Sequence, residues 1–117
     1  MFIEILMQLP PVHEQLIVAL DVPKITDAMH LVDTLGDTVS FYKVGMQLYF
    51  AEGNAFIRTL QERQKKIFLD LKINDIPETV AKAVESIASL KVDYLTLFTG
   101  AAQIKAATAT LLSLHDF

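Results

Sequence analysis

The chain has 117 residues, of which 52% are hydrophobic and 21% charged, a composition typical of folded proteins because disordered chains combine low hydrophobicity with high charge. The net charge of −4 argues against a sequence-independent nucleic-acid binder, and no uncharged apolar run approaches the roughly 18 residues that a membrane span needs. The sequence contains no cysteine, which excludes disulfides, thiolate metal sites and cysteine nucleophiles and fits a cytoplasmic protein.

Apolar runs typical of strands alternate with helical patterns along the chain. Residues 1–14 precede this alternation and are expected to form an irregular leader. Gly36 is expected to end the first helix, and Pro77 suits the first turn of the third. We predict strands over 16–20, 39–44, 66–72 and 92–98, and helices over 28–35, 47–63, 78–90 and 101–114. The boundary of the second helix is uncertain because residues 52–54 read as a loop.

Strands that are apolar on both faces and alternate with helices indicate an α/β fold with a parallel sheet. The sequence supplies four such βα units. An open flavodoxin-like sheet needs about five strands, and a (β/α)₈ barrel needs about 250 residues. A four-stranded sheet would also leave two edges unpaired. We therefore expect residues 1–117 to be a single partial domain, the front part of a longer protein.

Charged residues stand at the ends of the first three predicted strands: Asp21, Lys43, and then Asp70 with Lys72. Ligands of parallel α/β folds bind outside the carboxyl ends of strands, so these charges predict a site. The alternative is that strand ends are polar because they meet solvent. The recurrence over three consecutive strands favours a site. The three histidines are scattered without the spacing of metal ligands, so no metal site is predicted.

The densest group of charges is Asp70, Lys72 and Asp75. The first two point to the same side of a strand, roughly 6.6 Å apart along it, and Asp75 follows the strand end, where the chain can turn back. An ammonium between two carboxylates keeps its proton, which suits a proton donor or an electrostatic clamp. A surface ion-pair cluster is the alternative, but the strand is apolar enough to be buried, and buried charge is costly.

Three segments resemble orotidine 5′-phosphate decarboxylases. They are Leu-Ile-Val-Ala-Leu-Asp-Val-Pro at 16–23, Tyr-Lys-Val-Gly at 42–45, and Ile-Phe-Leu-Asp-Leu-Lys-Ile-Asn-Asp-Ile-Pro-Glu-Thr-Val at 67–80. The third is close to the family signature Asp-x-Lys-x-x-Asp-Ile-Pro-x-Thr. The resemblance begins near Gln15 and covers the N-terminal half of the family, which implies the first four units of a TIM (β/α)₈ barrel.

The resemblance also implies roles for the charged residues. Asp21 and Lys43 would bind ribose hydroxyls and join a charged network. Asp70 would lie against the substrate carboxylate, and Lys72 would donate the proton. The implied reaction converts orotidine monophosphate to UMP, in pyrimidine biosynthesis, without a cofactor or a metal.

The resemblance further implies a homodimer with shared active sites. Asp75, Ile76 and Thr79 would reach into the site of the neighbouring subunit. The family's phosphate-binding arginine and closing loops belong to its second half. We therefore expect the 117 residues alone to be inactive.

The sequence departs from the family at two kinds of position. After the fourth strand the family usually has Val-His-x-x-Gly-Gly, whereas this chain has Phe98 in place of the histidine and Ala101-Ala102 in place of the glycines, so Phe98 receives no role. Gln64 and Lys91 stand where the family often ends a helix with glycine, and a left-handed residue there would be mildly strained.

Two other functions compete with the decarboxylase. A sugar-phosphate lyase of the same superfamily, such as hexulose-phosphate synthase, shares Asp-x-Lys-x-x-Asp but uses Mg²⁺. The residues from Ile76 to Thr79 favour the decarboxylase. The second alternative is a non-catalytic half-barrel, which the short chain and Phe98 would suit.

Overall fold

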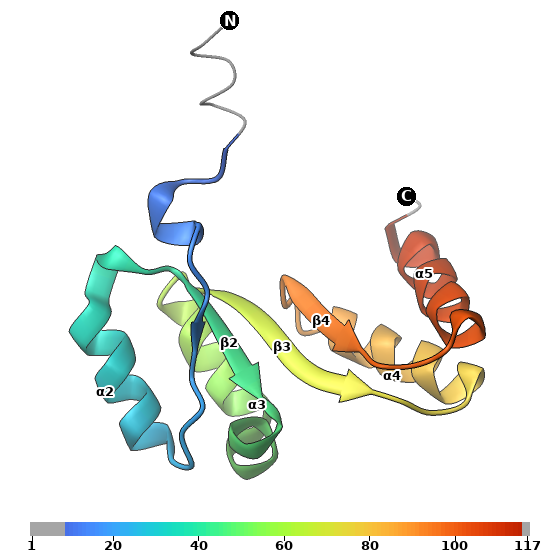
Figure 1. Ribbon diagram of the computed structural model, residues 1–117, viewed down its shortest axis with the longest axis horizontal. Helices are drawn as coiled ribbons and strands as arrows, with labels where there is room; N and C mark the ends of the chain where they lie inside the picture. The colour runs from blue at the N-terminus through green and yellow to red at the C-terminus, as the bar shows by residue number, and fades with distance from the viewer. Residues whose placement is uncertain (1–8, 116–117) are drawn as a thin grey trace, which may run out of the picture. The chain divides into compact units, whose positions relative to one another are not determined.

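The computed structural model describes residues 9–115, which form two compact units (Figure 1). The first ends at Phe68 and the second begins at Leu69. Strand pairing follows the order β1-β2-β3-β4, the order of the chain, and β3 (Lys66–Ile73) contributes to both units. This alternation of parallel strands and helices is the α/β arrangement predicted from the sequence. That residues 1–117 form a single domain stays a prediction.

The first unit packs two helices against short parallel strands. It contains the 3-10 turn η1 (Val12–Glu14), β1 (Val18–Ala19), α2 (Ile25–Leu35), the 3-10 turn η2 (Gly36–Thr38), β2 (Phe41–Gly45) and α3 (Met46–Glu62). Val18 lies opposite Tyr42, and Ala19 lies opposite Lys43. The core of this unit is made of fully buried apolar side chains from β2, the helices and the segment after β1, among them Leu20, Ala28, Val44, Phe56 and Leu60.

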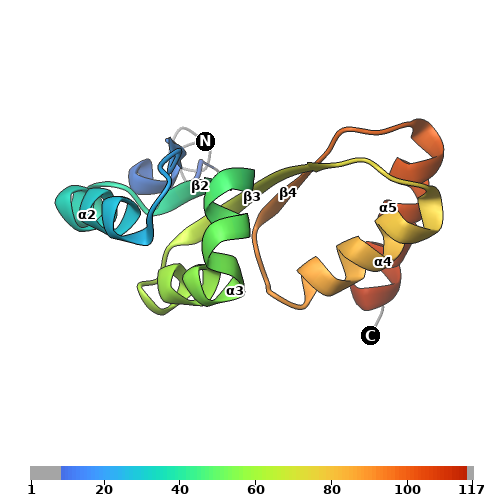
Figure 2. The same cartoon turned by 90° about the horizontal axis from the view of Figure 1, so that it is seen from below.

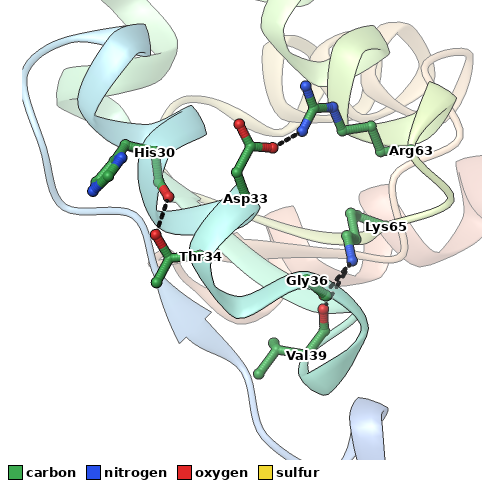
Figure 3. A network of polar contacts seen from close by, with 7 residues as sticks. All are labelled: His30, Asp33, Thr34, Gly36, Val39, Arg63 and Lys65. Atoms are coloured by element: carbon green, nitrogen blue, oxygen red, sulfur yellow. Dashed lines mark hydrogen bonds and ion pairs between the residues drawn. The ribbon is translucent and has the colours of Figure 1, made fainter.

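Polar contacts join the end of α2 to the segment after α3 (Figure 3). Arg63 forms an ion pair with Asp33. The Nζ of Lys65 donates to the carbonyl oxygens of Gly36, at 2.9 Å, and Val39, at 3.0 Å. These bonds satisfy carbonyl groups that the end of a helix leaves without partners, so they stabilise the turn between α2 and β2.

Helix α3 is bent at Gly53, whose φ of 66° and ψ of −157° are not helical. A side chain is strained at such a φ, whereas glycine adopts it readily. The loop-like sequence predicted at 52–54 therefore corresponds to a kink inside α3.

The second unit is a single βαβα segment. It comprises β3 from Leu69 onwards, α4 (Pro77–Ala88), β4 (Tyr94–Leu97) and α5 (Ala101–His115). Helices α4 and α5 pack side by side (Figure 2). The core of the unit consists of Val80, Val84 and Ala107, with Ile73, Leu95 and Leu97 packed against them.

The predicted strands and helices all occur among the described residues, with changed boundaries. The expected strand over 16–20 is reduced to Val18–Ala19, and the strand over 92–98 to Tyr94–Leu97. Pro77 is the first residue of α4, as predicted. Of the expected irregular leader, residues 1–8 lie outside the described residues, and Val12–Glu14 forms a 3-10 turn that the sequence did not predict.

Helix ends explain three unusual backbone angles. Gly36 ends α2 with a φ of 51°, as the sequence predicted. Gln64, after α3, and Lys91, after α4, have φ angles of 61° and 59°. Both positions are therefore left-handed, which agrees with the glycine that the family often has there. The mild strain follows, since left-handed backbone brings Cβ close to the following carbonyl oxygen.

Candidate active site

Asp70 and Lys72 form a close ion pair at the end of β3. Lys72 Nζ lies 3.0 Å from Oδ1 and 2.9 Å from Oδ2 of Asp70. Asp70 is 7% exposed, the one charged residue in the buried core of the described chain, whereas the Lys72 side chain is 55% exposed. A buried carboxylate is tolerated where charged and hydrogen-bonding partners compensate it. The sequence-based prediction that Asp70 and Lys72 lie on one side is confirmed.

The backbone of Lys72 is left-handed, with a φ of 48°. Residues without glycine's freedom rarely adopt this conformation, and such strain is concentrated at functional sites. The N–H of Lys72 donates to the side chain of Thr96, Oγ1, at 3.0 Å. The sequence did not predict this conformation, because lysine has no preference for it.

Thr96, on β4, contacts both members of the ion pair. Its Oγ1 lies 2.7 Å from Asp70 Oδ1 and 3.0 Å from the backbone nitrogen of Lys72. The direction of the two bonds follows from the chemistry of the partners: an N–H can only donate, and an ionised carboxylate can only accept. The threonine hydroxyl therefore accepts from Lys72 and donates to Asp70. The sequence reasoning did not identify Thr96.

Asp75 lies apart from Lys72 in the same chain. Its Oδ1 accepts a hydrogen bond from the backbone N–H of Ile76 at 2.7 Å, and the structure records no ion pair between Asp75 and Lys72. Within residues 9–115, Lys72 therefore does not lie between Asp70 and Asp75, contrary to the arrangement considered from the sequence, because Asp75 turns toward the start of α4. Asp75, Ile76 and Thr79 are all exposed.

Asp21 and Lys43 lie at the ends of neighbouring strands in the first unit. The backbone N–H of Leu20 donates to the carbonyl oxygen of Lys43 at 2.9 Å, so Asp21 follows directly on a residue paired with β2. A Cβ added to Gly45 would lie 3.5 Å from Asp21 Oδ1, which places this carboxylate beside the end of β2. Asp21 and Lys43 therefore come from neighbouring strands, and that their side chains share one site stays a prediction.

The segment after β4 also differs from the polar strand end expected of the family. Phe98 is 75% exposed, and its N–H donates to the carbonyl oxygen of Ile73 at 3.0 Å. The hydroxyl of Thr99 is buried and has no hydrogen-bond partner among the described residues. Phe98 offers no polar group to a ligand.

A hollow of about 750 Å³ in the second unit is not lined by Asp70, Lys72 or Thr96. It is lined by the end of α4, the start of β4 and the end of α5, including Val84, Tyr94 and Leu111. Ligand sites of parallel α/β folds lie at the carboxyl ends of strands, so this hollow at the opposite end of β4 is not the candidate site.

No helix between residues 9 and 115 combines the length and the apolar character that crossing a membrane requires. Within the same residues, no three histidine or acidic side chains gather closely enough to hold a metal ion.

A family model described as "Orotidine 5'-phosphate decarboxylase / HUMPS family" matches residues 14–115. An orotidine 5′-phosphate decarboxylase of Bradyrhizobium sp. (strain ORS 278) is 47% identical over 96 residues, which cover 82% of this chain and 40% of the relative. The decarboxylase of Rhodopseudomonas palustris (strain HaA2) is 48% identical over 88 residues, covering 75% and 37%. The chain thus spans about two fifths of the length of these curated relatives.

Solved structures resemble the chain over a similar extent. The crystal structure of orotidine 5′-phosphate decarboxylase from Lactobacillus acidophilus aligns with a TM-score of 0.74 and 37% identity, covering 84% of this chain and 45% of that one. The structure of an uncharacterized conserved protein from Geobacillus kaustophilus gives a TM-score of 0.75, also at 37% identity, covering 81% and 45%.

Proposed function

The chain belongs to the orotidine 5′-phosphate decarboxylase / HUMPS family, and from that premise we propose that the complete protein converts orotidine monophosphate to UMP. Its parallel strands and alternating helices are the first part of a TIM barrel. The curated relatives that match it are named decarboxylases, which favours this activity over the related sugar-phosphate lyase. A role in pyrimidine biosynthesis follows from the same proposal.

The observation that carries the proposal is the ion pair of Asp70 and Lys72 at the end of β3. Decarboxylation breaks the bond between C6 and the carboxylate carbon, and the electron pair stays on C6 until a proton reaches it. The Lys72 ammonium would stabilise the negative charge that develops at C6 and then donate its proton there. Such an interaction is stronger in the transition state than in the ground state, which is the condition for catalysis.

Asp70 would act on the substrate before the bond breaks. Placed against the substrate carboxylate, its own carboxylate would repel the bound ground state, and the repulsion would end when CO₂ departs. The burial of Asp70 supports this role, since a charge held away from water is screened less. Asp21 and Lys43 would bind the ribose hydroxyls.

We further propose that the active protein is a homodimer with shared sites. Asp75, Ile76 and Thr79 are exposed, with 62% of Ile76 accessible, so they are available to a neighbouring subunit. The absence of an ion pair between Asp75 and Lys72 within the described chain is compatible with Asp75 serving the partner's site. The cytoplasmic location expected from the sequence stays a prediction.

The test is an assay of the complete protein with orotidine monophosphate as substrate. We expect orotidine monophosphate to be decarboxylated at the same rate with and without EDTA. Loss of activity in EDTA would favour the Mg²⁺-dependent lyase, and a folded, complete protein without any decarboxylase activity would favour the non-catalytic half-barrel. The 117-residue chain, assayed alone, should be inactive because remote phosphate contacts supply binding energy that is used at the reacting carbon.

A further inference from the structure

The hydroxyl of Thr96 bonds to two parts of the charged pair, the carboxylate of Asp70 and the backbone of Lys72. It donates to the carboxylate of Asp70 at 2.7 Å and accepts from the backbone N–H of Lys72 at 3.0 Å. The first bond fixes the orientation of a carboxylate, and the second fixes the backbone from which the lysine side chain starts. One side chain thus bonds to both members of the pair.

The side chains of β4 alternate in a way that isolates this hydroxyl from the core. Leu95 and Leu97 pack against the apolar cluster of α4 and α5, and Thr96 between them points to the other face of the strand. That face carries the Asp70 carboxylate, which is buried and needs partners. The polar contacts of Thr96, and not packing against α4 and α5, therefore explain why a threonine stands at this position.

The left-handed backbone at Lys72 makes the second bond important. A lysine with a φ of 48° is strained, and it keeps that conformation only if its surroundings hold it. Lys72 lies within β3, yet its N–H donates to a side chain, so the hydroxyl of Thr96 takes the place of a strand carbonyl as acceptor. Without the hydroxyl, the residue would be freer to relax into extended backbone, which would redirect the ammonium.

We propose that Thr96 is a positioning residue for decarboxylation, holding the Lys72 backbone and the Asp70 carboxylate so that the ammonium lies at the reacting carbon. The proposal rests on the proposed function of the pair. Thr96 acts through its two neighbours, so its loss should reduce turnover more than substrate binding. An ammonium displaced by about 1 Å is enough to slow a reaction substantially.

The test uses the complete protein with Thr96→Val, which keeps the shape and removes the hydroxyl, and Thr96→Ser, which keeps the hydroxyl. Thr110→Val is the matched control, because the Thr110 hydroxyl is also part-buried in the second unit but bonds only to the carbonyl of Ala106 in its own helix. We expect Thr96→Val to lower kcat at least tenfold with KM changed less than threefold. The Ser variant and the control should stay within threefold of wild type in both constants.

Structures of the variants separate this proposal from the proposed function. Even if the wild-type protein does not decarboxylate orotidine monophosphate, a crystal structure of Thr96→Val should show Lys72 out of its left-handed conformation or its Nζ beyond hydrogen-bond distance of Asp70. An unchanged Lys72 and Asp70 in that structure would overturn the proposal, as would more than a third of wild-type kcat in an active enzyme. If neither Thr96→Val nor Thr96→Ala folds, the hydroxyl serves folding and the positioning role is wrong.

Discussion

Removing the ammonium of Lys72 should abolish turnover while costing little stability. In Lys72→Ala the Asp70 carboxylate loses a cation that lies within 3.0 Å of both its oxygens. The lysine side chain is more than half exposed, so water can take the place of the ammonium beside Asp70, and we expect a loss of about 1 kcal/mol in the free energy of unfolding. Proton donation by a positioned group contributes about 10² to 10⁴ in rate, or about 2.7 to 5.4 kcal/mol of barrier.

A matched control is available on α4. Lys82 forms an ion pair with Glu78 at 2.9 Å, the same distance as between Lys72 Nζ and Asp70 Oδ2. The side chains of Lys82 and Glu78 are both more than 70% exposed. Lys82→Ala should change stability by less than about 0.5 kcal/mol and leave kcat unaltered. Comparison of the two variants separates the loss of a lysine ion pair from the loss of the reacting ammonium.

A third variant separates catalysis from strain. Lys72→Gly also removes the ammonium but relieves the left-handed backbone, so it should be more stable than Lys72→Ala by about 1 kcal/mol and equally inactive. The measurements are kcat at saturating orotidine monophosphate and the free energy of unfolding in urea. If Lys72→Ala kept more than about a tenth of wild-type kcat, a barrier change under roughly 1.4 kcal/mol, the proton-donor role would be refuted.

Other features of the structure make further predictions. Gln64→Gly should raise the free energy of unfolding by about 0.5 to 1 kcal/mol, because Gln64 ends α3 with a φ of 61°, and an unchanged urea midpoint would contradict this. Burial raises the pKa of the Tyr42 hydroxyl, so the unfolded chain releases this proton first and stability should fall as pH rises above about 10. Tyr42→Phe should flatten that fall, and an equally steep alkaline loss in the variant would show that other groups cause it. Equal mixing of inactive Lys72→Ala and Asp75→Asn homodimers should restore roughly a quarter of the sites under two-fold symmetry, whereas no recovery after subunit exchange confirmed by native mass spectrometry would place Asp75 in its own subunit's site.

The helices were predictable from the sequence because particular residues mark their ends. Gly36 ends α2 and Pro77 begins α4, as their backbone preferences require. The first strand was predicted too long because an apolar run does not reveal which residues find hydrogen-bonding partners. Leu16 and Ile17 belong to the run but are 70% and 42% exposed, outside the pairing with β2.

The charged residues of the site could be predicted from the sequence, but Thr96, which bonds to them, could not. Asp70 and Lys72 were identified because charge in a buried strand needs a reason. Thr96 is one polar residue in an apolar run, and such a threonine is common in strands. Its alternation with Leu95 and Leu97 was the available signal, since it places the hydroxyl on the face opposite the helices. The backbone of Lys72 depends on a contact with another strand, which local sequence does not encode.

The short sequence separation within the site has a consequence for folding during synthesis. Asp70 and Lys72 are two residues apart, and Thr96 follows Asp70 by 26 residues within one βαβ unit. Closing a loop of this length costs little more chain entropy than closing a shorter one, since the cost rises only with the logarithm of length. The carboxylate, the ammonium and the hydroxyl can therefore meet once β4 has left the ribosome. The contacts among these three groups then do not have to wait for any distant part of the chain.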